Sequence, residues 1–229
     1  MKKITGITAI SFDGDGTLWD FEKVMQHSLR YVLQELKQID PDAAALLDIE
    51  TMIQTRNKVA ARLRGKITNL EQIRYEAFKK TLKDIGRPNN ALARHLNHVY
   101  LKHRFEDIKL FDDVLPTLNV LKPTYTLGLL SNGNSYPERC GLQKMFKFVV
   151  FSQDYGIEKP DPRLFQRAVE KAGCSKQQLL HVGDSLTNDI AGSKAAGIKS
   201  VWLNRKRENP PDSTDYEITS LAELLNILE

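Results

Sequence analysis

The sequence holds little that would place it outside ordinary globular proteins. It has only 2 cysteines among 229 residues, Cys140 and Cys174, which excludes a disulfide-stabilised scaffold, and we expect both to be reduced thiols. Its apolar runs are a handful of residues long, far short of the about 20 that a membrane-spanning helix needs. Signal-peptide features, internal repeats and low-complexity tracts are also missing. We therefore expect a cytoplasmic protein with no membrane partner.

A strong charge of one sign is missing too. The chain has 33 Lys and Arg against 29 Asp and Glu, a formal net charge of +4. The basic excess lies within residues 20–109, which hold 17 basic and 12 acidic side chains. Such a weak bias can steer small anions toward a cleft. It lacks the interleaved basic and aromatic residues of nucleic-acid-binding surfaces, so we expect no nucleic-acid partner.

Short apolar runs alternate with helical patterns over most of the chain. The runs are too short for globular helices and are rich in β-branched and aromatic residues, which favours strands. Because several are apolar throughout, they predict a buried parallel sheet with helices on both faces, a Rossmann-like, doubly wound α/β core. The predicted strands are 7–12, 125–130, 148–151, 179–182 and 200–203, and the predicted core helices are 114–118, 162–172, 188–196 and 221–228.

Two of these helices have clear start signals, and one connection is a clear loop. Asp161 before Pro162 is a capping residue followed by a first-turn proline. Ser220 and Glu223 have the spacing of a capping box. Residues 205–215 are polar and contain proline, so they predict a loop.

Residues 19–106 interrupt the alternation of strands and helices. No convincing strand occurs there, and the apolar residues recur with helical spacing. We therefore predict a four-helix cap domain over residues 19–106, inserted after the first strand, with residues 1–18 and 107–229 forming the α/β core. The four helical patterns lie at about 25–36, 49–63, 69–85 and 90–105.

Two acids end the first apolar run abruptly. Asp13 and Asp15 are one residue apart, and acids are poor strand formers, so strand propensity does not explain them. Gly14 and Gly16 allow the backbone to bend so that both acids face one pocket. Two carboxylates that close repel each other unless a cation or a shared proton intervenes. The pattern predicts a metal site, an acid–base pair or both, with an ordinary turn as the alternative.

Other polar residues also stand directly after predicted strands. Ser131 and Asn132 follow the second run, and Asp184 follows the fourth. Parallel sheets bind ligands outside the carboxyl ends of their strands. We expect these side chains to share one edge of the sheet with Asp13 and Asp15.

Four ordered motifs together resemble the haloacid dehalogenase (HAD) superfamily of phosphohydrolases. The helical insert also lies where that family has its type I cap, so the resemblance covers essentially the whole chain. One departure is Gly14, where family members usually have a bulkier apolar residue, although no catalytic group is lost. The motifs are Asp13-Gly14-Asp15-Gly16-Thr17-Leu18, Ser131-Asn132-Gly133, Lys159-Pro160 and Gly183-Asp184-Ser185-Leu186-Thr187-Asn188-Asp189.

The chemistry of phosphate ester hydrolysis gives these residues roles. Asp13 is expected to attack phosphorus and form an aspartyl phosphate, which divides one difficult step into two. Asp15 is expected to protonate the leaving oxygen and later deprotonate the attacking water. Lys159 would neutralise the phosphate and the intermediate. The Ser131 hydroxyl and Asn132 are expected to bind the substrate phosphate.

An acidic, oxygen-only site favours Mg²⁺ as the cofactor. Asp13 and Asp184 would supply carboxylate ligands, and the resemblance implies that the backbone carbonyl of Asp15 completes the protein ligands. Asp189 is expected to hold metal-bound water or to orient Lys159, with a favourable helix-start acid as the alternative. Thr17 is expected to hydrogen-bond across the catalytic turn.

Several histidines look functional by composition alone. His95, His98 and His103 fall in one predicted helix, but His98 and His103 are five residues apart and diverge, which favours a solvated face over a metal cluster. His181, in the strand before Asp184, is expected to be structural.

The predicted function is Mg²⁺-dependent hydrolysis of a small phosphorylated metabolite. The metal-independent dehalogenases of the family lack an acid at the position of Asp15, which argues against carbon–halogen cleavage. A phosphomutase, a 2-haloacid dehalogenase and, more remotely, a non-catalytic scaffold stay open as alternatives. Sugar phosphates, phosphoglycolate and nucleoside monophosphates are all left open as substrates, and the protein is expected to be a monomer or a homodimer.

Overall fold

The computed structural model describes residues 3–106, 108–209 and 215–229. The chain divides into two compact units, one formed by Met1–Asp20 with Lys109–Glu229 and the other by Phe21–Ile108. Residue 107, where the core was predicted to resume, lies outside the described residues. So does part of the predicted loop at 205–215.

The first unit is built on a six-stranded sheet in which every neighbouring pair is parallel. The strand order is β3-β2-β1-β4-β5-β6, so the first strand of the chain lies near the middle and is buried along its whole length. This confirms the predicted doubly wound α/β class. The strands are β1 (Ala9–Phe12), β2 (Thr126–Ser131), β3 (Phe148–Phe151), β4 (Leu179–Gly183), β5 (Lys199–Leu203) and β6 (Glu217–Ile218).

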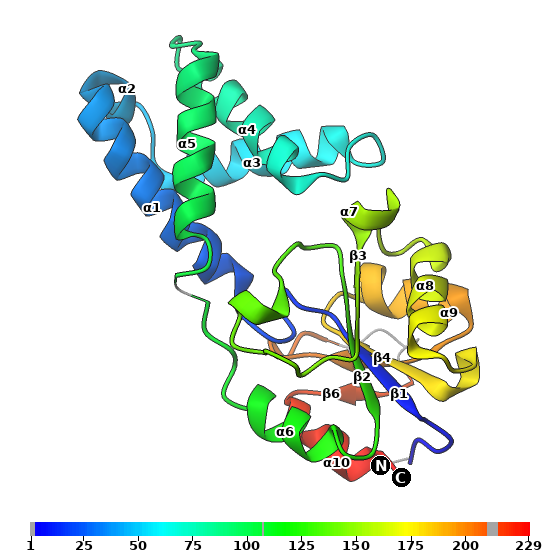
Figure 1. Ribbon diagram of the computed structural model, residues 1–229. Helices are drawn as coiled ribbons and strands as arrows, with labels where there is room; N and C mark the ends of the chain where they lie inside the picture. Colours follow the sequence, from blue (N-terminus) through cyan, green and yellow to red (C-terminus); the bar gives the residue numbers. More distant parts are fainter. Residues whose placement is uncertain (1–2, 107, 210–214) are drawn as a thin grey trace. The chain divides into compact units, whose positions relative to one another are not determined.

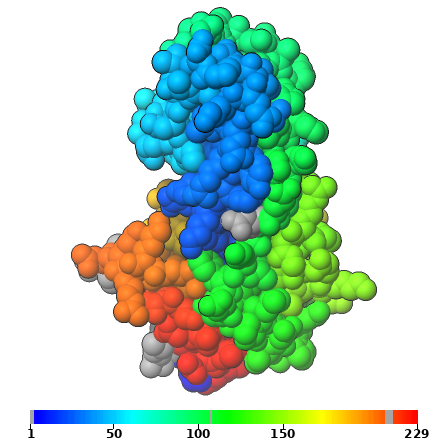
Figure 2. All heavy atoms as spheres, turned by 90° about the vertical axis from the view of Figure 1, so that its left-hand side faces the viewer, coloured from blue at the N-terminus to red at the C-terminus, as the bar shows by residue number. Residues whose placement is uncertain are grey.

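Helices cover both faces of this sheet (Figure 1). On one face α8 (Pro162–Ala172) and α9 (Gly192–Ala196) pack on the strands, and their apolar side chains share a buried cluster with β1, β2, β3 and β4. On the other face α6 (Val114–Leu121) contacts α10 (Leu224–Ile227). In Figure 2 the red C-terminal segment accordingly lies beside the green segment that contains α6.

Short helical segments complete this unit. The π-helical segment η3 (Leu186–Ala191) runs directly into α9, so the helix predicted over 188–196 begins two residues earlier and is irregular at its start. The remaining segments are α7 (Ser152–Tyr155) and the 3₁₀ turns η1 (Pro137–Arg139), η2 (Lys176–Gln178) and η4 (Leu221–Glu223).

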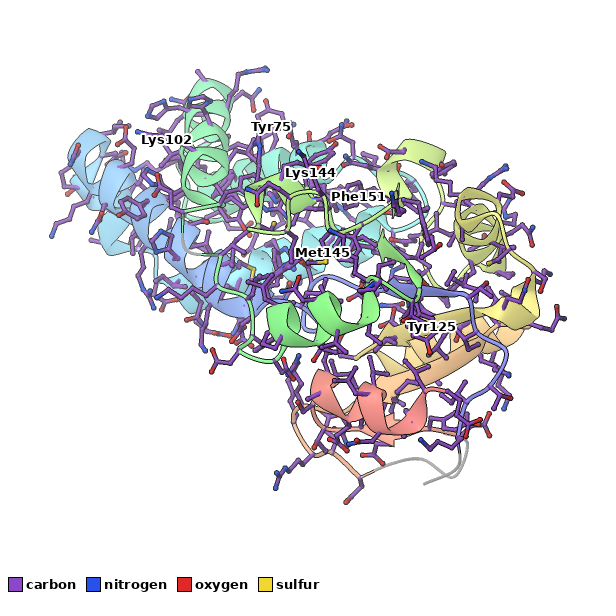
Figure 3. All side chains as sticks on the ribbon, turned by 60° about the horizontal axis from the view of Figure 1, so that its bottom comes forward. Tyr75, Lys102, Tyr125, Lys144, Met145 and Phe151 are labelled. Carbon is purple, nitrogen blue, oxygen red and sulfur yellow. The ribbon has the colours of Figure 1, made fainter. Side chains whose placement is uncertain are left out.

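The C-terminal edge contains one strand that the sequence analysis did not predict. β6 is only two residues long and pairs with the end of β5, so it carries no apolar periodicity to detect. The capping box of Ser220 and Glu223 is confirmed and starts η4 directly after it. The Tyr125 hydroxyl, labelled in Figure 3, donates to the backbone carbonyl of Glu229, 3.2 Å away.

The second unit consists of four long helices and one short one. The additional short helix forms because Asp40 accepts a hydrogen bond from the Ala43 N–H and Pro41 occupies the first turn. Asp48, Asn69 and Asn89 cap the next three helices in the same way. The helices are α1 (Phe21–Ile39), α2 (Pro41–Ala45), α3 (Ile49–Leu63), α4 (Leu70–Asp84) and α5 (Asn90–His103).

An apolar core of its own holds the second unit together. It includes Leu29, Val32, Phe78 and Leu96, which come from three different helices. On its surface Tyr75, labelled in Figure 3, has the Lys79 ammonium 5.4 Å and the Arg94 guanidinium 5.3 Å from its ring centroid.

Two predictions from composition can be compared with the described residues. Cys140 and Cys174 are both free thiols. Among the described helices, none is both long enough and apolar enough to cross a membrane.

Candidate active site

Three adjacent strands bring the predicted site residues to one edge of the sheet. The parallel register pairs Phe12 with Leu129 of β2 on one side and with Val182 of β4 on the other. Asp13 therefore follows β1 between Ser131, which ends β2, and Asp184, which follows β4. The carboxyl ends of the strands meet there, as the sequence predicts.

Lys159 links two carboxylates within this edge. Its ammonium donates to Asp13 Oδ1 and to Asp189 Oδ1, each at 2.6 Å. A third bond, at 3.0 Å, goes to the backbone carbonyl of Leu130 in β2. All three donor positions are used and the side chain is only 2% exposed, so Lys159 is held as a fixed cation beside the predicted nucleophile.

Asp189 is held from three directions. Besides Lys159, it accepts from the Ser185 N–H at 2.9 Å and contacts His181 Nε2 at 3.1 Å. Burial lowers the pKa of His181, which favours the neutral ring. Because a carboxylate only accepts, Nε2 has the proton, and Nδ1 accepts from the Ser11 hydroxyl 2.9 Å away.

His181 therefore has a specific partner in the site, which its apolar strand context did not reveal. The sequence predicts a structural role for His181, and the side chain is completely buried. Its ring bridges β1 and the carboxylate that orients Lys159. The one available signal was its position two residues before Gly183 in a strand that ends at the site.

The electrostatics separate Asp189 from the other two acids. Burial tends to raise the pKa of Asp189, but Lys159 and the His181 hydrogen bond outweigh it and hold that pKa well below its usual range. Burial lowers the pKa of Lys159, but the carboxylates of Asp13 and Asp189 raise it more, so the net change is an increase. Lys159 and Asp189 thus form a stable ion pair.

Asp13 and Asp184 are left with uncompensated charge. Burial raises the pKa of Asp13 well above its usual range, with Lys159 opposing and both other acids adding to the increase. Burial and Asp189 raise the pKa of Asp184 to about 6. Three ionised carboxylates around one ammonium leave two negative charges, and burying such an excess is unfavourable without a further cation.

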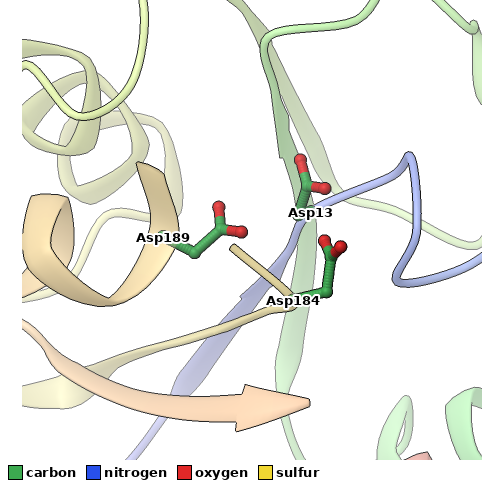
Figure 4. Close-up of side chains that lie close together, drawn as sticks. All are labelled: Asp13, Asp184 and Asp189. Atoms are coloured by element: carbon green, nitrogen blue, oxygen red, sulfur yellow. The ribbon is translucent and has the colours of Figure 1, made fainter. Parts of the chain in front are cut away.

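Asp13, Asp184 and Asp189 form a cluster of carboxylates that could hold that cation (Figure 4). One oxygen of each lies within 4.8 Å of the others. Both oxygens of Asp189 already accept hydrogen bonds, whereas Asp184 is only partly buried. The available ligands are therefore the carboxylates of Asp13 and Asp184. Both offer oxygen only, and the two uncompensated negative charges of the cluster suit Mg²⁺.

The turn after β1 is shaped around Asp184. Gly16 has φ +86°, and a Cβ added there would lie 2.4 Å from Asp184 Oδ2, so only glycine fits. The Thr17 hydroxyl donates to Asp184 Oδ1 at 3.3 Å, so its hydrogen bond reaches the acid that follows β4.

Ser131 and Asn132 lie at the end of β2 and use their side chains differently. Ser131 Oγ accepts from the Gly133 N–H at 3.0 Å, which leaves its own proton available. The Asn132 amide donates to the Lys159 carbonyl at 2.9 Å and accepts from the Lys159 N–H at 2.7 Å. In this arrangement Asn132 is directed to Lys159, and its predicted contact with phosphate stays a prediction.

Asp15 lies apart from the three clustered acids. Its Oδ1 accepts a hydrogen bond of 2.7 Å from the indole N–H of Trp19, and the residue is half-buried. The structure therefore places Asp13 with Lys159, Asp184 and Asp189, and Asp15 beside Trp19 and the β2 loop. The two acids of the opening motif therefore have different surroundings.

Arg205, which no sequence pattern indicated, contacts the turn after β1. Arg205 donates through Nη2 to the Thr17 carbonyl at 2.9 Å and makes two bonds to the Asp113 carboxylate. Its guanidinium lies 4.1 Å from the centroid of the Phe111 ring. Thr17 is 188 positions and Asp113 is 92 positions from Arg205 in the sequence, so only the fold brings them together.

Comparison with known proteins places this site in context. Residues 10–203 match the family model of haloacid dehalogenase-like hydrolases. The chain is 27% identical to the glyceraldehyde 3-phosphate phosphatase of Methanopyrus kandleri over 97% of both chains.

Two solved structures have the same fold over nearly the whole chain. The 2-haloacid dehalogenase from Pseudomonas syringae pv. Tomato DC3000 superimposes with a TM-score of 0.81 at 30% identity, covering 96% of this chain and 97% of that one. The HAD-hydrolase YfnB from Bacillus subtilis bound to magnesium gives a TM-score of 0.76 at 26% identity, covering 97% and 99%.

Proposed function

The chain belongs to the haloacid dehalogenase-like hydrolases, and we propose that it is a Mg²⁺-dependent phosphatase acting on a small phosphorylated metabolite. The observation that carries this proposal is the pair of acids on one turn with different surroundings. Asp13 lies against the Lys159 ammonium, and Asp15 lies apart from that cluster with one oxygen beside the β2 loop. Such a pair suits one nucleophile and one proton carrier.

Asp13 is the nucleophile of the proposed reaction. One of its oxygens attacks phosphorus, the bond from phosphorus to the leaving oxygen breaks, and an aspartyl phosphate forms. Lys159, fixed 2.6 Å from Asp13, stabilises the negative charge on the phosphoryl group as it transfers. Asp189 keeps that ammonium charged and in place.

Asp15 transfers the proton in both half-reactions. In the first, its proton passes to the leaving oxygen, which departs as an alcohol. In the second, the Asp15 carboxylate takes a proton from the water that attacks phosphorus. Inorganic phosphate is released, Asp13 is regenerated, and Asp15 is again protonated.

Asp13 and Asp184 would hold the metal ion, with the Asp15 carbonyl as the further ligand implied by the family. When bound, Mg²⁺ supplies positive charge that neutralises the substrate phosphate and the excess of carboxylate charge at the site. The Ser131 hydroxyl, whose proton is not used within the loop, is suited to donate to a phosphate oxygen. The hydrogen bond from Thr17 orients Asp184.

We further propose that the helical unit is the family's type I cap and selects the substrate. Its sequence interval, predicted as residues 19–106, holds the basic excess of the chain, which suits an anionic substrate. The similarity to a glyceraldehyde 3-phosphate phosphatase over nearly the whole length supports a substrate of that size.

The experiment that tests the proposal is a phosphate-release assay on a panel of phosphorylated metabolites. We expect turnover with Mg²⁺, none with EDTA, and none in Asp13→Asn. Ranking the substrates by kcat/KM then identifies the substrate class. Absence of metal-dependent turnover on the whole panel would contradict the phosphatase proposal.

A 2-haloacid dehalogenase is the second candidate, because a protein so described superimposes closely on this chain. It would displace halide at carbon and would need no acid at position 15. Halide release from L-2-chloropropionate, measured on the same preparation without metal, distinguishes the two activities. We expect no halide release, since Asp15 and the uncompensated negative charge at Asp13 and Asp184 suit phosphoryl chemistry.

A further inference from the structure

Trp19 is bound to the one acid that stands apart from the charged cluster. Its indole Nε1–H donates to Asp15 Oδ1 at 2.7 Å, and the indole is only 1% exposed. The turn brings them together through the backbone as well, because the Gly16 N–H donates to the Trp19 carbonyl at 2.8 Å. Trp19 is therefore tied to the turn by both its indole N–H and its backbone carbonyl.

The other oxygen of Asp15 faces the loop that follows β2. A Cβ placed on Gly133 would lie 2.9 Å from Asp15 Oδ2 and 3.1 Å from Ser131 Oγ. Oδ2 and the Ser131 hydroxyl thus border the same small space. An oxygen that already accepts the indole N–H is a poor site for a carboxylic proton, so the proton of neutral Asp15 belongs on Oδ2.

Gly14 makes this arrangement sterically feasible. A Cβ added to Gly14 would lie 2.7 Å from Trp19 Cζ2 and 2.9 Å from Cη2, closer than van der Waals contact allows. Any larger side chain would push the indole away from Asp15. The departure of Gly14 from the family pattern and the presence of Trp19 are thus two parts of one feature.

We propose that Trp19 is a positioning residue that holds Asp15 Oδ1, so that the transferable proton resides on Oδ2 beside the phosphate-binding loop. Gly14 provides the space that the indole requires. The inference rests on the proposed role of Asp15 as general acid and base. It assigns the two oxygens of that acid and names the residue that fixes them.

The leaving group provides a readout that a merely structural role would not change. Under kcat/KM conditions only steps through departure of the leaving group count. A 4-nitrophenolate leaves without protonation, whereas an alkoxide needs the proton of Asp15. Misplacing that proton should therefore slow alkyl phosphates selectively.

The test compares 4-nitrophenyl phosphate with the alkyl phosphate that the wild type hydrolyses fastest. Trp19→Phe keeps an aromatic ring and removes the N–H donor. We expect kcat/KM for the alkyl phosphate to fall by about tenfold to a hundredfold, with a change of about twofold or less for 4-nitrophenyl phosphate. Asp15→Asn should show the same selectivity with a larger loss.

Trp202→Phe is the matched control, because the chain has 2 tryptophans and both are 1% exposed. Its single indole N–H donates to the backbone carbonyl of Asp184 at 2.9 Å rather than to Asp15. It should therefore lower kcat/KM for both substrates by one common factor. The ratio between the substrates is the diagnostic quantity.

Gly14→Ala is a second route to the same outcome, with the indole kept. It should reduce kcat/KM selectively for the alkyl phosphate, and adding it to Trp19→Phe should cause little further loss, since phenylalanine lacks the clashing atoms. Independent, additive effects of the two substitutions would contradict the proposed pairing.

Failure of the inference and failure of the proposed function are separable. If Asp15→Asn is selective while Trp19→Phe lowers both substrates equally or neither, the positioning role is wrong and the general acid stands. If Asp15→Asn lowers kcat/KM equally for the alkyl phosphate and 4-nitrophenyl phosphate, Asp15 is not the general acid. That result would contradict both the proposed mechanism and the positioning role of Trp19.

Discussion

The side-chain amide of Asn132 makes two hydrogen bonds to the backbone of Lys159. Its Nδ2 donates to the Lys159 carbonyl and its Oδ1 accepts from the Lys159 N–H, at 2.9 and 2.7 Å. A residue at the end of β2 thereby fixes a segment that is 27 positions away. The ammonium beside Asp13 is held at its tip by two carboxylates and at its backbone by Asn132.

We predict that Asn132→Asp impairs both stability and catalysis. The aspartate still accepts from the Lys159 N–H, but it replaces the donor with an acceptor facing the Lys159 carbonyl. An unmade buried hydrogen bond costs about 1–3 kcal/mol, and a displaced Lys159 should lower kcat by about tenfold or more. Chemical denaturation and steady-state kinetics measure the two effects.

The matched control for Asn132 is Asn226→Asp, an exposed asparagine in α10. It introduces the same chemical change far from Lys159 and should shift stability by about 0.5 kcal/mol or less. Wild-type kcat in Asn132→Asp would show that Asn132 does not position Lys159.

A second prediction concerns the carboxylate that pairs with Lys159. Asp189→Asn replaces an oxygen that accepts from buried donors with an NH₂ group that faces one of them. Breaking a buried ion pair typically costs about 3–5 kcal/mol. We expect a loss of that order in the free energy of unfolding, together with weaker turnover, measured by urea denaturation and phosphate release.

The comparison variant for Asp189 is Asp84→Asn at the exposed Lys80–Asp84 pair. Surface ion pairs contribute about 0–1 kcal/mol, so this variant should retain nearly all its stability. Equal losses in the two variants would mean that burial adds nothing to the Lys159–Asp189 interaction.

The fold and much of the site geometry follow from local sequence features. Apolar runs predicted five of the six strands, because buried parallel strands need continuous apolar residues. Strand ends predicted where Asp13 and Asp184 would meet. β6 escaped prediction because two residues carry no periodicity, and its pairing depends on the end of β5.

Contacts between distant residues could not be predicted in the same way. The two amide hydrogen bonds of Asn132 reach the backbone of Lys159, and nothing in a Ser-Asn-Gly turn specifies that partner. The predicted contact of Asn132 with phosphate stays a prediction. Gly14 had no explanation in the sequence, since its reason is the position of the Trp19 ring. Such relations appear only when the backbone path is known.

A third prediction concerns pH and metal binding. Burial and Asp189 raise the pKa of Asp184 to about 6. An acid with a raised pKa in the folded state favours folding while protonated, so the metal-free protein should lose this contribution as the pH rises from about 4 through 6. Mg²⁺ binds the ionised form, so stabilisation by Mg²⁺ should increase over the same interval.

Thermal denaturation with and without Mg²⁺, at pH 5 and pH 7.5, checks this directly. We expect a larger increase in Tm from Mg²⁺ at pH 7.5, and Asp184→Asn should make that increase smaller and less dependent on pH, with Asp13 as the remaining carboxylate ligand that titrates. A Tm increase that is equal at both pH values would contradict a metal site that includes Asp184.

The last prediction separates a steric requirement from a backbone requirement at the catalytic turn. Gly16 and Gly197 both have positive φ, +86° and +74°. A Cβ on Gly16 would lie 2.4 Å from Asp184 Oδ2, whereas a Cβ on Gly197 would have nothing within 4 Å. Alanine at either position should cost about 1–2 kcal/mol of stability for the left-handed backbone. Only Gly16→Ala should also displace Asp184 and weaken Mg²⁺ binding. Isothermal titration with Mg²⁺ distinguishes them, and unchanged Mg²⁺ affinity in Gly16→Ala would show that Asp184 does not hold the metal from its position beside the turn.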